Sequence, residues 1–232
     1  MSLKINILPQ PDDVTCGPTS LHAVYEYYGY HIPLDQLIRE VNYLEEGGTL
    51  AVLLGIDAIR RGFKAKLYSY NLKVFDLTWS NLSNEELIVK LKEQLKVKKG
   101  VKFTFASKSY IEFLELGGKI VFEDLHSGIL KRYFSQNIPI LSGLSATYLY
   151  NSKREYTNHK DQSIYDDIKG YPMGHFVVLS GMINENEVLV ADPYSGNPFS
   201  KNNYYKVNIQ RLINSILLGI VTYDANLLII TQ

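Results

Sequence analysis

The chain has 232 residues, a length that fits one large domain or a core with insertions. Lysine plus arginine equals aspartate plus glutamate, 24 each, and the charges are interspersed, so nucleic acid and anionic membranes are disfavoured as partners. A single cysteine excludes an intramolecular disulfide and any metal site built from several cysteines. The N-terminus has no apolar stretch of signal-peptide length, and the apolar runs are much shorter than a membrane span. We therefore expect a soluble cytoplasmic protein.

Apolar residues in the first half of the chain recur at helical spacing. The pattern predicts helices over 18–28, 33–43, 49–61, 84–97, about 107–116 and 126–135. Pro18 suits the first turn of its helix, where its missing N–H has no partner to lose. Ser83 or Asn84 is a typical N-cap for the fourth helix, with acidic residues following in its first turn. Alternating or apolar segments at 64–71, 119–123 and 138–144 indicate strands between these helices.

The remainder of the chain changes character. Residues 151–171 are polar and rich in charge, tyrosine and asparagine, which predicts an exposed loop or lid. The segments 175–183, 187–193, 204–209 and 226–230 favour an antiparallel sheet, the first two being joined by a polar turn. Helices first and a sheet later define an α+β protein.

Cys16 is the first candidate for chemistry. It lies directly before the first predicted helix, where unpaired N–H groups and the positive end of the helix dipole favour a thiolate, the reactive form of cysteine. A buried cysteine that only fills space is the alternative interpretation, because free cysteine is among the most buried residue types.

A nucleophilic cysteine needs a base and a group that orients it. Of the five histidines, His175 stands out because it follows Gly174 and opens an apolar strand, which can present the imidazole rigidly. If the following hairpin turns near residue 183 or 184, antiparallel pairing brings Asp192 within about one residue of facing His175. A carboxylate there can fix the imidazole tautomer, although Asp192-Pro193 is also a common start of a turn.

Gln10 precedes Cys16 by six residues and supplies a fourth polar element. Attack of a thiolate on a carbonyl places charge on oxygen, which a glutamine amide and the Cys16 backbone N–H can stabilise. Candidate substrate contacts are Asp13, which can bind an amine at the rim of a cleft, Tyr148, and Gly174. The sequence contains no nucleotide, EF-hand or zinc motif, so we expect no cofactor and no metal.

Together these residues resemble the C39 family of papain-like cysteine peptidases. The shared features are Gln10 followed after five residues by Thr15-Cys16-Gly17-Pro18-Thr19, and later "GHFVVLSG" and "ADP". The segments "GGTLAVLLGIDAIRRGF" and "IPILSGL" are also similar to that family. Longer phrases, such as "GYPMGHFVVLSG", resemble stand-alone bacterial C39-like proteins that are often encoded near ATP-grasp ligases.

The resemblance implies a papain-like fold with a helical lobe bearing Cys16 and an antiparallel sheet lobe bearing His175 and Asp192. It implies Cys16 as nucleophile, His175 as base, Asp192 as orienting group and Gln10 as oxyanion donor. Residues 1–232 would form one papain-like domain, with a helical insertion at about 71–130 and a polar loop insertion at about 148–173. Transporter-linked C39 domains cleave leader peptides after a double glycine. Here the sequence has no membrane-spanning segment, and Cys16 and His175 are farther apart in the sequence than in those domains. Cleavage of a leader peptide is therefore not expected from the resemblance.

Three functions remain open on the sequence. The first is a thiol hydrolase that cleaves a peptide or amide bond through an acyl-enzyme. The second keeps the acyl-enzyme but passes the acyl group to an amine, as papain-like transpeptidases and acyltransferases do. The third is a catalytically silent binding protein on the same scaffold, because a fold does not define a function.

Overall fold

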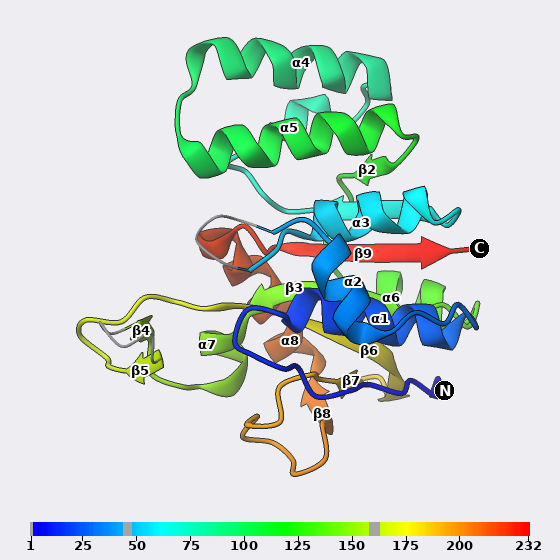
Figure 1. Cartoon of the computed structure of the whole chain (residues 1–232), viewed down its shortest axis with the longest axis vertical. Helices are drawn as coiled ribbons and strands as arrows, with labels where there is room; N and C mark the ends of the chain where they lie inside the picture. The colour runs from blue at the N-terminus through cyan, green and yellow to red at the C-terminus, as the bar shows by residue number, and fades with distance from the viewer. Residues whose placement is uncertain (1, 44–47, 158–162) are drawn as a thin grey trace.

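A computed structural model describes residues 2–43, 48–157 and 163–232 (Figure 1). Its α-helices are α1 Cys16–Tyr27, α2 Leu34–Glu40, α3 Ala51–Arg60, α4 Asn84–Val97, α5 Val101–Glu115, α6 Ser127–Phe134, α7 Ala146–Tyr150 and α8 Ile209–Leu218. Its strands are β1 Lys64–Ser69, β2 Lys119–Val121, β3 Ile140–Ser145, β4 Glu155–Thr157, β5 Ser163–Tyr165, β6 Gly174–Asn184, β7 Glu187–Ala191, β8 Tyr204–Asn208 and β9 Asn226–Thr231. Two short 3-10 helices, η1 Leu77–Trp79 and η2 Gly219–Thr222, complete the described elements.

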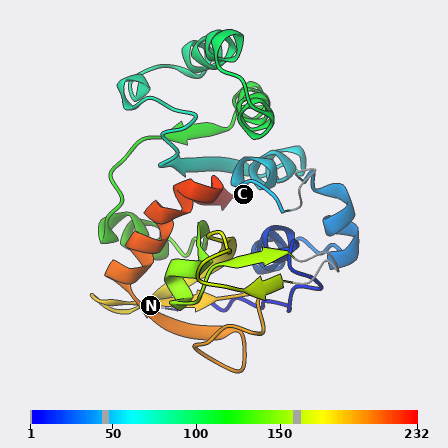
Figure 2. The same cartoon turned by 90° about the vertical axis from the view of Figure 1, so that its left-hand side faces the viewer.

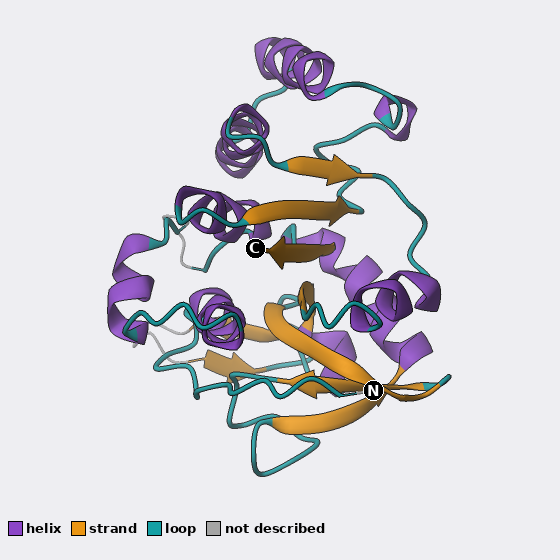
Figure 3. Cartoon of the chain, turned by 90° about the vertical axis from the view of Figure 1, so that its right-hand side faces the viewer, coloured by secondary structure: helices purple, strands orange, loops and turns teal. Residues whose placement is uncertain are grey.

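Seven strands form the main sheet, in the order β2-β1-β9-β3-β6-β7-β8. All neighbours are antiparallel except β1 and β2, which are parallel and are connected through the α4–α5 helical hairpin. Helices lie on both faces of the sheet, with α1, α2 and α3 (blue to cyan in Figure 2) on one side and α6 and α8 (green and orange-red) on the other (Figures 2 and 3). The fold is therefore α+β with a largely antiparallel sheet, as expected, although strands from the first half of the chain also join that sheet.

Helix α1 is held directly against β6. Its inner face buries Leu21, Val24 and Tyr25 almost completely, and the Ser20 hydroxyl donates a 3.1 Å hydrogen bond to the carbonyl of Phe176. A side chain at Gly17 would place its Cβ 2.2 Å from Cγ2 of Thr49, so only glycine allows this close approach. The start of α1 is thus fixed beside the start of β6.

Several predicted boundaries differ from the observed ones. Helix α5 begins six residues before the expected position, following Gly100, whose φ of 144° suits glycine. Residues within the segment expected to be a polar loop form the two-stranded sheet β4–β5, which extends from the body beside α7 (Figures 1 and 2). Helix α8 was not predicted, although Asn208 caps it by accepting hydrogen bonds from the backbone N–H groups of Gln210 and Arg211.

The region expected as a helical insertion, about 71–130, contains η1, α4, α5, β2 and the start of α6. The α4–α5 hairpin stands at one end of the molecule in Figure 1, and β2 joins the edge of the main sheet. Ser83, one of the two N-caps expected for α4, caps it in a capping box with Glu86. The part of the chain that the structure describes contains no helix long and apolar enough to cross a membrane.

Candidate active site

Cys16 is the first residue of α1. The preceding residue, Thr15, makes no side-chain capping hydrogen bond, and the first turn contains no acidic residue. The sulfur therefore lies at a helix N-terminus whose positive end is not offset by a cap or a carboxylate from its own first turn. Cys16 is 9% exposed, so access to it is narrow.

His175 lies between Cys16 and Asp192. Cys16 lies close enough to His175 to raise the pKa of its imidazole, and Nε2 of His175 is 2.8 Å from Oδ1 of Asp192. His175 is 6% exposed and Asp192 is fully buried. The start of α1, the start of β6 and the end of β7 thus bring Cys16, His175 and Asp192 together.

The register of the hairpin explains how the last contact forms. Strands β6 and β7 pair Asn184 with Glu187 and Val178 with Ala191, with bulges between Leu179 and Gly181 and between Met182 and Asn184. The turn therefore lies slightly later than the position, near residue 183 or 184, at which Asp192 would face His175. The bulges absorb part of this displacement, so the Asp192 carboxylate reaches back to His175 although the two residues are not paired opposite each other.

Burial and charge act in opposite directions on the imidazole. Burial alone disfavours imidazolium, but the charge and hydrogen bond of Asp192, together with the contact with Cys16, outweigh it and raise the pKa of His175 to about 10. Burial also opposes ionisation of Asp192, yet His175 and the hydroxyl donors around the carboxylate hold the pKa of Asp192 below its usual value. The pair is therefore suited to an imidazolium beside a carboxylate at neutral pH.

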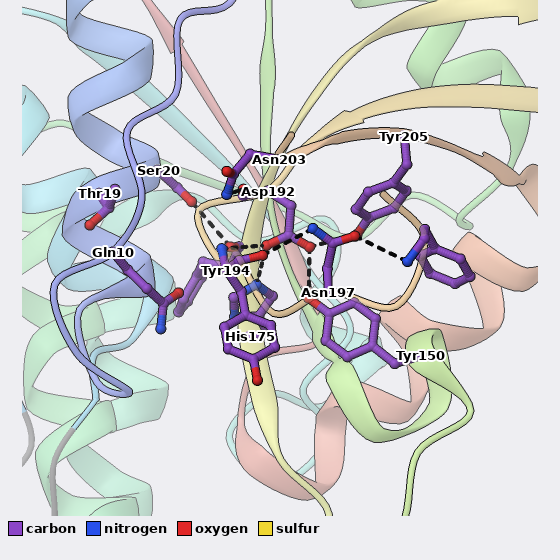
Figure 4. A network of polar contacts seen from close by, with 12 residues as sticks. Gln10, Thr19, Ser20, Tyr150, His175, Asp192, Tyr194, Asn197, Asn203 and Tyr205 are labelled. Carbon is purple, nitrogen blue, oxygen red and sulfur yellow. Dashed lines mark hydrogen bonds and ion pairs between the residues drawn. The ribbon is translucent and has the colours of Figure 1, made fainter. Parts of the chain in front are cut away.

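Four groups donate to the Asp192 carboxylate, which lies at the centre of the network in Figure 4. Oδ1 accepts from His175 and, at 2.9 Å, from the backbone N–H of Tyr194. Oδ2 accepts from the hydroxyls of Tyr150 and Tyr205, each at 2.7 Å. The backbone of Asp192 is also fixed, because its N–H donates to the Asn203 carbonyl and its own carbonyl accepts from the Asn203 amide.

A backbone hydrogen bond holds Gln10 next to the Asp192 turn: the N–H of Gln10 donates to the carbonyl of Pro193 at 2.9 Å. Its Nε2 donates to the Asp12 carbonyl at 2.7 Å, and its Oε1 is buried with no hydrogen-bond partner among the described residues. Rotation of this amide by half a turn would put the NH₂ group at the buried position, free to donate.

A cavity of about 210 Å³ adjoins His175. Its walls are Gln10, Asp13, Ala146, Tyr150, Glu155, Ser163, Tyr165, Met173, Gly174, His175 and Tyr194. The β4–β5 sheet contributes part of this wall, and Ser163 at the start of β5 donates to the carboxylate of Asp13 at 3.2 Å. Burial and the nearby Asp13 raise the pKa of Glu155. The cavity therefore places two carboxylates close to His175.

The three predicted substrate contacts have different positions. Asp13 and Gly174 line the cavity. A Cβ at Gly174 would lie 1.9 Å from Oδ2 of the buried Asp224, so this position requires glycine. Tyr148 does not line the cavity; it packs under the guanidinium of Arg211 on α8, 5.2 Å from it, and its hydroxyl accepts from Asn214.

Sequence reasoning gave no role to Tyr205 or Glu155. Tyr205 lies in an alternating strand that could be recognised, but nothing local indicates that its hydroxyl reaches Asp192. Glu155 lies within the polar segment that was expected to be a loop. The described residues contain no group of three or more His, Cys, Asp or Glu side chains arranged to hold a metal ion.

Comparison with known protein families shows the family to which the chain belongs. Residues 2–215 match the model of the Peptidase_C39 like family, and the chain belongs to this family. A comparison with curated proteins found no match.

Three solved structures align with most of this chain. A protein from Bacillus anthracis described as a C39-like peptidase is 15% identical, with a TM-score of 0.48 and coverage of 99% of this chain and 95% of the other. A double glycine motif protease from an AMS/PCAT transporter, in complex with its leader peptide, is 16% identical, with a TM-score of 0.46 and coverage of 99% and 93%. The peptidase domain of Streptococcus ComA, a bi-functional ABC transporter involved in quorum sensing, is 13% identical, with a TM-score of 0.46 and coverage of 98% of both chains.

Proposed function

We propose that this protein is a cysteine peptidase-like hydrolase that cleaves a peptide or amide bond through an acyl-enzyme. Cys16 is the nucleophile, His175 the general base and acid, and Asp192 the group that orients His175. The observation that carries the proposal is the 2.8 Å contact between His175 and the buried Asp192, with Cys16 at the start of α1 acting on the same imidazole. Membership of the Peptidase_C39 like family supports the same chemistry.

In the first half of the reaction, the Cys16 sulfur attacks the carbonyl carbon and forms a carbon–sulfur bond. An imidazolium at His175 favours the thiolate form of the neighbouring sulfur before attack. It then gives its proton to the leaving nitrogen as the carbon–nitrogen bond breaks, which releases an amine and leaves a thioester on Cys16.

In the second half, His175 takes a proton from water as the water oxygen attacks the thioester. The carbon–sulfur bond breaks, the acid product leaves, and the proton on His175 restores the starting ion pair with Cys16. Asp192 stabilises imidazolium at each stage and remains ionised throughout.

Gln10 is the proposed oxyanion donor, together with the backbone N–H of Cys16. The buried position now held by its unpartnered Oε1 supports this role, because an amide rotated there would meet a developing oxyanion with an N–H group. The role therefore requires Gln10 to release the Asp12 carbonyl when substrate binds.

The cavity beside His175 is the proposed substrate site. Asp13 and Gly174 form part of its wall, and the β4–β5 sheet closes one side of it. The narrow access to Cys16 favours an extended peptide or a small amide over a folded protein. The single-domain organisation over 1–232, with insertions at about 71–130 and 148–173, is part of the same proposal.

Two alternative functions would use part of the same site. An acyltransferase would use the same acyl-enzyme with an amine as acceptor, and the wall that β4–β5 forms beside the cavity favours it, because excluding water favours transfer. A binding protein would use the cavity without chemistry. Two further parts of the proposal rest on sequence alone: a cytoplasmic location and a functional link to an ATP-grasp ligase.

The test is turnover of a peptide and amide library by the wild type and Cys16→Ala, with and without added primary amines. The proposal predicts hydrolysis products that disappear in Cys16→Ala, whose circular dichroism remains that of the wild type. Amide products formed only with added amines would support transfer instead. Equal turnover by Cys16→Ala would exclude the acyl-enzyme.

A further inference from the structure

The carboxylate of Asp192 accepts two hydrogen bonds in addition to its contact with His175. A carboxylate can orient a histidine without them. Both come from tyrosine hydroxyls, and both reach Oδ2, the oxygen that does not face His175. A carboxylate oxygen away from water needs donors, but one donor or a backbone N–H would satisfy it. Two tyrosines from separate elements therefore make a specific arrangement around one atom.

Tyr150 is held in place from several sides. It is the last residue of α7, and Asn151 next to it adopts a left-handed conformation that ends the helix. Arg211 on α8 donates to the carbonyls of Leu149 and Tyr148, which fixes the backbone just before Tyr150. The direction of the Tyr150 hydroxyl is thus set by α7 and α8 together.

Tyr205 comes from a different element. It lies on β8 at the edge of the main sheet, pairs with Val190 and is 7% exposed. The ring of Phe199 packs against both tyrosines, with centroids 4.8 Å from Tyr205 and 6.0 Å from Tyr150. Burial and the charge of Asp192 raise the pKa of both hydroxyls, which remain neutral donors.

We propose that Tyr150 and Tyr205 are positioning residues that fix the rotation of the Asp192 carboxylate, so that Oδ1 alone faces His175, and that share its negative charge. This inference rests on the proposed function, because it assigns the tyrosines a role in the Cys16–His175–Asp192 set. Tyr150 also lines the cavity beside His175, which brings one of the two donors to the proposed substrate site.

If the tyrosines share the charge of Asp192, removing one of them should shift the apparent pKa values in one direction. A hydroxyl donor favours the less protonated form of the group that it contacts. Cys16, His175 and Asp192 are coupled, so their protonation steps belong to the set and not to one residue. Loss of a donor to Asp192 therefore makes each protonation step easier and moves every apparent pKa of the set upward.

The test compares Tyr150→Phe, Tyr205→Phe and the double variant with the wild type. Tyr68→Phe is the matched control, because its buried hydroxyl pairs with that of Tyr133 at 2.8 Å and does not contact the site. Two profiles are recorded for each protein: the alkylation rate of Cys16 by iodoacetamide against pH, and the NMR titration of His175, assigned from the signal lost in His175→Gln.

The inference predicts that both profiles move to higher pH, by about one pH unit in the double variant and about half of that in each single variant. Tyr68→Phe leaves both profiles in place. Loss of thermal stability without movement of either profile would give the tyrosines a purely structural role and overturn the inference. The single variants carry the test if the double variant does not fold.

The outcomes separate this inference from the proposed function. A wild-type sulfur that reacts as an ordinary thiol, independent of His175, would contradict the proposed function, while the His175 titration would still test the tyrosines. A normal Cys16–His175 pair whose profiles are the same in all variants would leave the proposed function standing and reject the role of the tyrosines.

Discussion

The Asp192 carboxylate and the His175 imidazole are 2.8 Å apart although the strands that carry them do not pair these residues opposite each other. Strand β7 ends at Ala191, which pairs with Val178, and Asp192 follows in the turn region. The contact therefore depends on the bulged hairpin and on the backbone bonds between Asp192 and Asn203. Substitutions in the hairpin or at Asn203 should therefore alter the position of the carboxylate and, through it, the orientation of the imidazole.

We expect His175 to remain protonated at neutral pH. Since Asp192 and Cys16 raise its pKa to about 10, its NMR titration in the wild type should have a midpoint far above that of an exposed histidine, about 6.5. Asp192→Asn should move the midpoint down, because burial of the imidazole then acts without an opposing charge. A midpoint near 6.5 in the wild type would contradict the charged pair.

The same contact makes stability depend on pH at the acid end. The folded-state pKa of Asp192 lies below its unfolded value of about 3.9, so its stabilisation is complete above that value and is lost as pH falls through the folded-state pKa. Urea unfolding should therefore show a steeper loss of stability below about pH 4 in the wild type than in Asp192→Asn. Parallel curves for the two proteins would indicate that this carboxylate titrates alike in both states.

Gly174→Ala should destabilise the start of β6. Its Cβ would lie 1.9 Å from Oδ2 of Asp224 and 2.7 Å from Oγ1 of Thr222, so we expect a loss of about 1–3 kcal/mol in the free energy of unfolding. Asp224→Ala gives the methyl group space. The double variant should therefore lose less stability than the sum of the two single variants. Additive losses would show that the two positions do not compete for space.

Asn208→Ala tests the helix that sequence reasoning missed. Asn208 caps α8, and Arg211 in the first turn of α8 holds the carbonyls that precede Tyr150. Loss of the cap should cost about 1 kcal/mol of unfolding free energy. Asn208→Asp keeps an oxygen acceptor and should retain most of that stability in the same denaturation experiment. Equal losses in both variants would argue against the cap as the cause.

Local signals predicted much of the fold. Ser83 and its acidic neighbours defined the start of α4, because capping is determined by a few adjacent residues. The position of Cys16 before a helix and of His175 at the start of a strand followed from equally short patterns. Their meeting could be expected only through the resemblance to the C39 family, since contacts between distant segments leave no local pattern.

Other features depend on distant contacts and were not predictable in this way. The parallel pairing of β1 with β2 is formed across the whole α4–α5 hairpin. The β4–β5 sheet is built largely from polar residues, and its pairing, such as Glu155 with Tyr165, is not encoded by an apolar alternation. The hydroxyl of Tyr205 reaches Asp192 only because β8 pairs with β7.

The most direct test of the proposed Cys16–His175 pair is the pH dependence of Cys16 alkylation by iodoacetamide in the wild type and in His175→Ala. Cys16 is the only cysteine in the chain, so the reaction reports on one sulfur. We predict rapid alkylation of the wild-type sulfur at neutral pH and a large loss of that rate in His175→Ala. Alkylation that follows an ordinary thiol and does not change in His175→Ala would contradict the proposed Cys16–His175 pair.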